Sequence, residues 1–194
     1  MRLLIVILFF PLALLGQSTN VYTGKQTKTA EQQSNVIVAG GGGGGDTPFI
    51  SSVTGGVSVS PFDGIIGYQW VPPVNATITA LGIKPISGNS GTHTVYFLDV
   101  NGTILASASV NLSGSTAGVD VFTTISSLSV VSGTPYYVMM SVASGGDNYL
   151  NDSSTVTFAL SGVTQSSWNS ATGSTPHIQT GGAKSMGTPT FKFH

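Results

Sequence analysis

The stretch Thr92–Val110, THTVYFLDVNGTILASASV, decides the fold class of this chain. Strand-like runs rich in β-branched, aromatic and apolar residues lie on both sides of Asn101-Gly102. An Asn-Gly pair between such strands is a strong hairpin signal, because both central residues of a type I′ turn need a positive φ. The stretch therefore predicts an antiparallel β-hairpin.

Further strand-like segments flank this hairpin in both directions, separated by turn residues. A spacing of about 8–12 residues is typical of an antiparallel β-sandwich. Gly82 interrupts one segment and predicts a β-bulge; Trp70 is expected in the core. Tyr136 and Tyr137 should point to opposite faces, one into the core and one outward. No window combines a helical period with capping residues, so almost no helix is expected. The strand-like segments are 65–71, 77–83, 92–98, 103–110, 119–125, 135–142, 156–160 and 190–193.

The composition fits a turn-rich all-β protein and excludes several classes of function. Charged residues form 7% of the 194 residues, against about 25% in an average domain. Six Lys and Arg residues cannot form the basic face that nucleic-acid phosphates require, which argues against nucleic-acid binding. The absence of cysteine excludes disulfides, cysteine-ligated zinc, iron–sulfur centres and thiol catalysis.

The beginning of the sequence has the pattern of a secretory signal peptide. Met1-Arg2 is followed by the apolar run Leu3–Leu15, which is too short for a membrane span of about 20 residues and fits a signal-peptide core. We expect a signal peptide over residues 1–16, with cleavage before Gln17, and a secreted or cell-surface protein with no stable membrane insertion afterwards. A retained interfacial anchor is the alternative.

Residues 17–45 are expected to form a flexible spacer. They begin with a polar stretch, continue with the short strand-like run Val36–Ala39 and end in the hexaglycine Gly40–Gly45. No Lys-Ser/Thr pair follows the glycines, so they do not form a phosphate-binding loop. We interpret the hexaglycine as a hinge, the alternative being a backbone that passes close to another group. The β-sandwich domain is then expected over residues 46–194.

Several motifs, in order and spacing, resemble a bacterial domain family of unknown function that occurs in secreted and surface proteins and in phage tail proteins. The resemblance covers about residues 62–142, with Trp70 where phenylalanine is commoner. It implies a jelly-roll-like β-sandwich similar to carbohydrate-binding modules, and it supplies no catalytic residues. The motifs are GYQW at 67–70, ITALG at 78–82, HTV at 93–95, Asp99, GTILASA at 102–108 and SGTPYYV at 132–138.

Two polar segments near the end of the chain offer a candidate sugar site. Tyr149 and Trp168 could stack on a sugar ring, and the neighbouring Asn148 and Asn169 could bind its hydroxyls. The alternative is that each aromatic ring covers an end of the sandwich.

Calcium is a second hypothesis for the same region. Asp147, Asn151 and Asp152 offer oxygen ligands close together, although without the spacing of an EF-hand loop. Such residues are also ordinary turn formers, and no other cofactor is expected. His93 has no second ligand at a suitable spacing and is expected to bind a loop backbone rather than a metal.

The sequence contains no motif of a known catalytic site, such as G-x-S-x-G or H-E-x-x-H. We therefore expect an exported, non-enzymatic module for glycan binding or surface attachment, whose partner is a carbohydrate or a cell-surface component. The alternative is a virion structural protein, such as a phage tail-fibre or decoration subunit, and either protein could be an oligomer.

Overall fold

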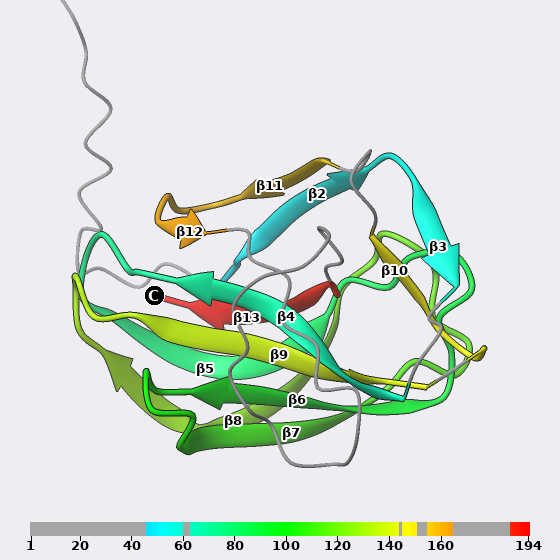
Figure 1. Cartoon of the computed structure of the whole chain (residues 1–194). Coiled ribbons are helices and arrows are strands. Elements are labelled where there is room, and N and C mark those ends of the chain that lie inside the picture. The colour runs from blue at the N-terminus through cyan, green and yellow to red at the C-terminus, as the bar shows by residue number, and fades with distance from the viewer. Residues whose placement is uncertain (1–45, 60–62, 144, 151–154, 165–186) are drawn as a thin grey trace, which may run out of the picture. The chain divides into compact units, whose positions relative to one another are not determined.

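The computed structural model describes residues 46–59, 63–143, 145–150, 155–164 and 187–194, and these residues form strands and no helix (Figure 1). Two antiparallel sheets pack against each other, which confirms the predicted all-β sandwich. The predicted signal peptide and spacer lie outside the described residues. The four-stranded sheet has the order β1 (Thr47–Pro48), β13 (Pro189–Phe193), β5 (Ala76–Ile83), β8 (Val121–Val130). The five-stranded sheet has the order β12 (Val163–Thr164), β4 (Gly64–Trp70), β9 (Tyr136–Val142), β6 (Thr92–Leu98), β7 (Ile104–Asn111).

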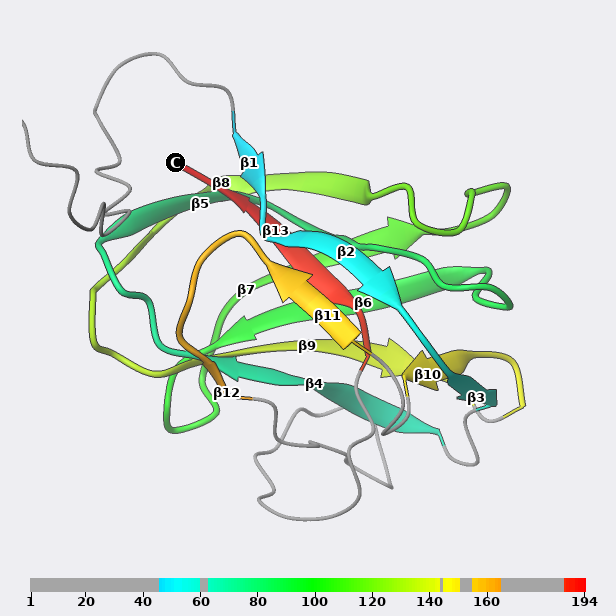
Figure 2. The same cartoon turned by 90° about the horizontal axis from the view of Figure 1, so that it is seen from above.

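The strand pairs are nested, so the domain is one long antiparallel ribbon. β6 pairs with β7 at its tip, and outward from the tip β5 pairs with β8, β4 with β9 and β1 with β13. Because these successive pairs alternate between the two sheets, the ribbon is rolled up as a jelly roll. Two short pairs extend the ribbon between β4–β9 and β1–β13: β3 (Val57–Val59) with β10 (Asn148–Leu150), and β2 (Ile50–Thr54) with β11 (Thr155–Phe158). Figure 2 shows the β2–β11 pair lying over β13.

The main core lies between the sheets and is rich in aromatic rings. Trp70 is fully buried, as expected from the sequence. Phe49 packs against it with ring centroids 5.0 Å apart and stacks on Phe191 at 4.3 Å. The polar groups of the two largest buried aromatics have hydrogen-bond partners: the Tyr68 hydroxyl donates to the Pro189 carbonyl over 2.8 Å, and Trp70 Nε1 donates to the Ser161 carbonyl over 3.2 Å. Burial of these rings provides the hydrophobic driving force for sheet packing.

The five-stranded sheet also buries apolar residues on its outer face. Tyr136 belongs to the main core, whereas Tyr137 belongs to a second cluster with Ile65, Leu98 and Met139. The two tyrosines therefore point to opposite faces, as predicted. The outward-pointing Tyr137 is nevertheless buried, because it packs in the second cluster on the outer face of the sheet.

The hairpin at the tip of the ribbon is confirmed, but its turn is shifted by one residue. The Gly102 amide donates to the Asp99 carbonyl over 3.1 Å, so Val100 and Asn101 are the central residues of the turn. Gly102 follows these two central residues and has a φ of 82°, a backbone conformation that favours glycine. A register shift between Phe97 and Leu98 accommodates this longer loop.

Gly82 is not the site of a bulge in the pairing of β5 with β8. The register shift falls between Ile78 and Ala80 instead. A side chain at Gly82 would collide with the Phe122 ring and the Val121 carbonyl. The glycine is therefore required for the close approach of the two strands rather than for an irregular backbone.

The connections between strands gather at two ends of the sandwich. The polar end is formed by the β5–β6, β7–β8 and β9–β10 connections, and the apolar end by the β4–β5, β6–β7 and β8–β9 connections. No helix in the described part of the chain is long and apolar enough to cross a membrane.

Candidate functional site at the polar end

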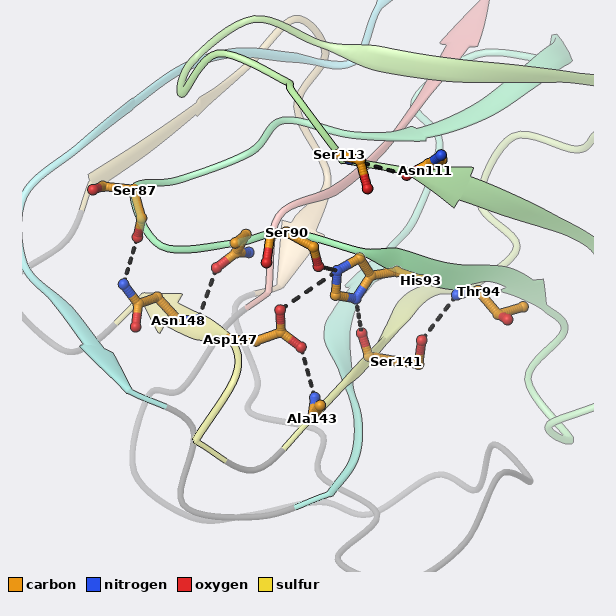
Figure 3. Close-up of polar contacts among 11 residues, drawn as sticks. Ser87, Ser90, His93, Thr94, Asn111, Ser113, Ser141, Ala143, Asp147 and Asn148 are labelled. Carbon is orange, nitrogen blue, oxygen red and sulfur yellow. Dashed lines mark hydrogen bonds and ion pairs between the residues drawn. The ribbon is translucent and has the colours of Figure 1, made fainter.

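The three connections of the polar end are bound to one another by hydrogen bonds. The Gly118 amide donates to the Pro85 carbonyl over 2.7 Å, and the Leu112 amide donates to the Gly91 carbonyl over 2.6 Å. The main-chain amide of Asn148, at the start of β10, donates to Asn89 Oδ1 over 2.7 Å. These bonds place the sequence-predicted Asn148 beside the β5–β6 connection (Figure 3).

Asn148 is held on both its main chain and its side chain. Its Nδ2 donates to the Ser87 carbonyl, which fixes the plane of the amide group (Figure 3). Between these partners, Gly88 has a φ of 95°, and a side chain there would collide with the Asn148 amide. A glycine is therefore needed at this position both for the backbone conformation and for the contact.

His93 and Asp147 form the buried centre of the polar end. His93 is the second residue of β6 and lies on the inward face of this strand. His93 is 4% exposed and Asp147 is 2% exposed. His93 Nε2 lies 3.4 Å from Asp147 Oδ1, and Asp147 Oδ2 accepts a hydrogen bond from the Ala143 amide over 2.6 Å. The carboxylate thus joins β6 to the turn between β9 and β10.

Both ring nitrogens of His93 also face main-chain carbonyl oxygens. Nδ1 lies 2.9 Å from the Ser141 carbonyl and Nε2 lies 2.8 Å from the Ser90 carbonyl. The expectation that His93 binds a loop backbone is therefore confirmed.

A serine, a histidine and an aspartate meet here without the geometry of a catalytic triad. The histidine contacts the carbonyl oxygen of Ser141, while the hydroxyl of Ser141 accepts a bond from the Thr94 amide over 2.8 Å. A nucleophile and its base must share a hydrogen bond between side chains. The contacts of His93 instead hold the connections in place.

The charged groups of the three connections are withdrawn from the surface, whereas Asp63, before the start of β4 at the same end, is exposed. Lys84 is buried and binds Asp120 Oδ2 over 3.1 Å. Burial raises the pKa of the Asp120 carboxyl above its ordinary value, and the neighbouring Lys84 only partly opposes this effect. The exposed residues of the described polar-end connections are all uncharged, and they include Ser87, Ser90, Ser113, Thr116 and Gly145. These connections therefore present neutral hydroxyl and amide groups together with the aliphatic side chain of Val119, which is 58% exposed.

Tyr149 is the sequence-predicted aromatic that the structure describes. It is half-buried in β10, pairs with Ser58 and packs against the main core. Part of the ring therefore covers the end of the sandwich, as in the alternative interpretation. The other predicted sugar-binding residues, Trp168 and Asn169, lie outside the described residues.

The calcium hypothesis is only partly covered by the structure. Both oxygens of Asp147 already contact groups of the protein, namely His93 and the Ala143 amide. Asn151 and Asp152 lie outside the described residues. Within the described part of the chain, no three His, Cys, Asp or Glu side chains are grouped so that they could hold a metal ion.

Sequence reasoning did not identify Ser87 and Asn89 as part of this site. They lie in the run SGNSG at 87–91, which has the composition of any turn. Nothing local in such a run indicates a partner about sixty residues away, such as Asn148. Comparisons of the chain with family models, curated proteins and solved structures find no match.

Proposed function

We propose that this protein is an exported, non-enzymatic β-sandwich module that binds neutral glycans at its polar end. The observation that carries the proposal is the fixed position of Asn148, with Tyr149 next to it, beside three connections whose described residues expose no charged side chain. The exposed Asp63, before the start of β4, is the one exposed charged residue that the described residues place at this end. Asn148 is held by Asn89 and Ser87, and the adjoining carboxylate of Asp147 is held by His93. The predicted signal peptide supports export.

The chemistry of this surface suits a sugar. Hydroxyl groups of a neutral glycan are recognised by amide and hydroxyl side chains, and the apolar face of a sugar ring packs on an aromatic ring. Asn148 and Ser87 supply the first kind of group, and the half-buried Tyr149 supplies the second. A single aromatic contact contributes about 1 kcal/mol beyond burial. Affinity per site should therefore be weak, near millimolar, and useful through multivalency.

A glycan array probed with the full chain, followed by titration calorimetry on the best ligand, tests the proposal. Tyr149→Ala together with Asn148→Ala should abolish binding. Asn101→Ala is the matched control, because Asn101 is an exposed asparagine at the apolar end and its loss should leave binding unchanged. Binding that survives the double variant, or no binding to any glycan, would overturn the proposal.

A separate observation favours the second candidate, a structural subunit of a virion. Of the six exposed large hydrophobic residues in the described part of the chain, five lie at the apolar end, where such residues suit an assembly contact. They are Val74, Val100, Ile104, Leu105 and Val131, between 37% and 57% exposed. Light scattering after size exclusion distinguishes the candidates. A stable oligomer that Val131→Asp dissociates supports the structural role, and a monomer contradicts it.

A further inference from the structure

The side-chain amide of Asn148 is oriented by a main-chain carbonyl. This amide lies against the Ser87 carbonyl oxygen, which can only accept a hydrogen bond, so the Nδ2 end of the amide must face it. The Oδ1 end is therefore directed away from Ser87 (Figure 3). Among the described residues, none donates a hydrogen bond to this oxygen. Asn148 thus offers a hydrogen-bond acceptor in a fixed direction.

The side-chain amide of Asn89 is oriented in the opposite sense. Its Oδ1 accepts the hydrogen bond from the main-chain amide of Asn148 over 2.7 Å, so its Nδ2 end is directed away from that bond. In the described part of the chain, this Nδ2 has no hydrogen-bond partner. Solvent reaches both free ends, because the described buried polar side-chain atoms without a partner are Asp120 Oδ1 and Thr188 Oγ1. Asn89 thus offers an accessible donor beside the acceptor of Asn148.

Gly88 keeps the two amides against each other. It lies between Ser87 and Asn89 in the chain and has a φ of 95°, and a side chain at this position would collide with the Asn148 amide. The donor and the acceptor are therefore in place before any ligand arrives. Binding groups that are ordered in advance lose less conformational freedom when a ligand binds.

One donor and one acceptor of fixed orientation complement a secondary amide, which carries one carbonyl acceptor and one N–H donor. A hydroxyl group can turn to donate or to accept, so hydroxyl recognition does not need two amides of opposite orientation. We propose that the polar end recognises the acetamido group of N-acetylated amino sugars. The acetamido N–H donates to Asn148 Oδ1, and the acetamido carbonyl accepts from Asn89 Nδ2. This inference rests on the proposed glycan binding and names the class of sugar.

Titration of the full chain, labelled with nitrogen-15, with two trisaccharides tests the proposal by nuclear magnetic resonance. Chitotriose carries an acetamido group on the second carbon of each ring, where cellotriose carries a hydroxyl group, and the two are otherwise alike. Chitotriose should bind about tenfold more tightly, as expected for the gain of two hydrogen bonds between neutral groups. It should also shift the side-chain amide resonances of Asn89 and Asn148. Equal affinities for the two trisaccharides would contradict the inference and leave the glycan proposal standing.

A matched pair of variants isolates the donor. Asn89→Asp keeps an oxygen that accepts the bond from the Asn148 amide and removes Nδ2, so the preference for chitotriose should disappear. Asn101→Asp introduces the same charge at the exposed hairpin of the apolar end and should keep the preference. A preference that survives Asn89→Asp, or binding of other glycans but of neither trisaccharide, would overturn this inference alone. Failure to bind any glycan would overturn the proposed function with it. The wild-type comparison decides even if Asn89→Asp does not fold.

Discussion

The polar and apolar ends of the sandwich use the same kind of connections for different purposes. At both ends neighbouring loops are joined by hydrogen bonds, for example Asn148 to Asn89 at one end and the Ser132 amide to Asn75 Oδ1 at the other. The connections of the polar end bury Lys84 and Asp147 and expose mainly hydroxyl groups, with Val119 as an aliphatic exception, whereas the apolar end exposes several aliphatic side chains such as Val131. The rolled ribbon fixes where the loops meet, and the loop residues decide what each end can contact.

The largest difference between the ends should appear when a carboxylate is removed. Asp147→Ala leaves the buried His93 and the Ala143 amide without their partner and should lower the free energy of unfolding by about 3–5 kcal/mol. Asp99→Ala should have a smaller effect, because water can replace the carboxylate at the exposed hairpin, where it binds the Asn101 and Thr103 amides. Urea unfolding measures both values, and equal losses would contradict the burial argument.

A pair of glycine substitutions sharpens the comparison at a smaller magnitude. Gly88 and Gly133 both have a positive φ, 95° and 77°, so alanine strains the backbone at either position by about 1–2 kcal/mol. Only at Gly88 would the new side chain also collide with Asn148, while the space around Gly133 is open. Gly88→Ala should therefore destabilise the protein more than Gly133→Ala in the same unfolding assay. The reverse order would show that Asn148 is not held against the β5–β6 connection.

The smallest expected difference between the two ends is in how their contribution to stability depends on acid pH. The amide of Thr103, with that of Asn101, holds the pKa of Asp99 below its ordinary 3.8, so its stabilising effect is present above that pH and is lost as the pH falls through the lowered pKa. Burial raises the pKa of Asp120, so its contribution has the opposite sign: it is present below 3.8 and is lost as the pH rises through the raised pKa.

The urea midpoint as a function of acid pH, for wild type and for two amide variants, checks these signs. Wild type should lose stability as the pH falls through the lowered pKa of Asp99, and Asp99→Asn should abolish this loss. Wild type should also lose stability as the pH rises through the raised pKa of Asp120, and Asp120→Asn should abolish that loss. Identical pH curves for the two variants would show that the ends do not differ in this respect.

Local pattern was enough to predict the hairpin and eight of the strands, although it covered only the first half of β8 and missed the short strands β1, β2, β3, β10 and β12. The strand-like runs around Asn101-Gly102 depend on near neighbours in sequence, and β6 has the bounds expected, Thr92–Leu98. The position of the turn could not be predicted in the same way, because Asp99 binds the Asn101 and Thr103 amides and the register shifts beside it. Side-chain capping of that kind competes with the propensity of the Asn-Gly pair.

The sequence by itself determined an all-β chain, low in charge, with Trp70 in its core, because period-2 patterns and composition are local properties. The tertiary structure alone decided that Tyr137 is buried on the outer face, that Gly82 serves a close approach, and that His93 meets Asp147. These contacts depend on which strands become neighbours when the ribbon rolls up. His93 lies 48 residues from Ser141, and Asn148 lies 59 residues from Asn89. Such pairs form only when non-local strand pairing brings the loops of one end together.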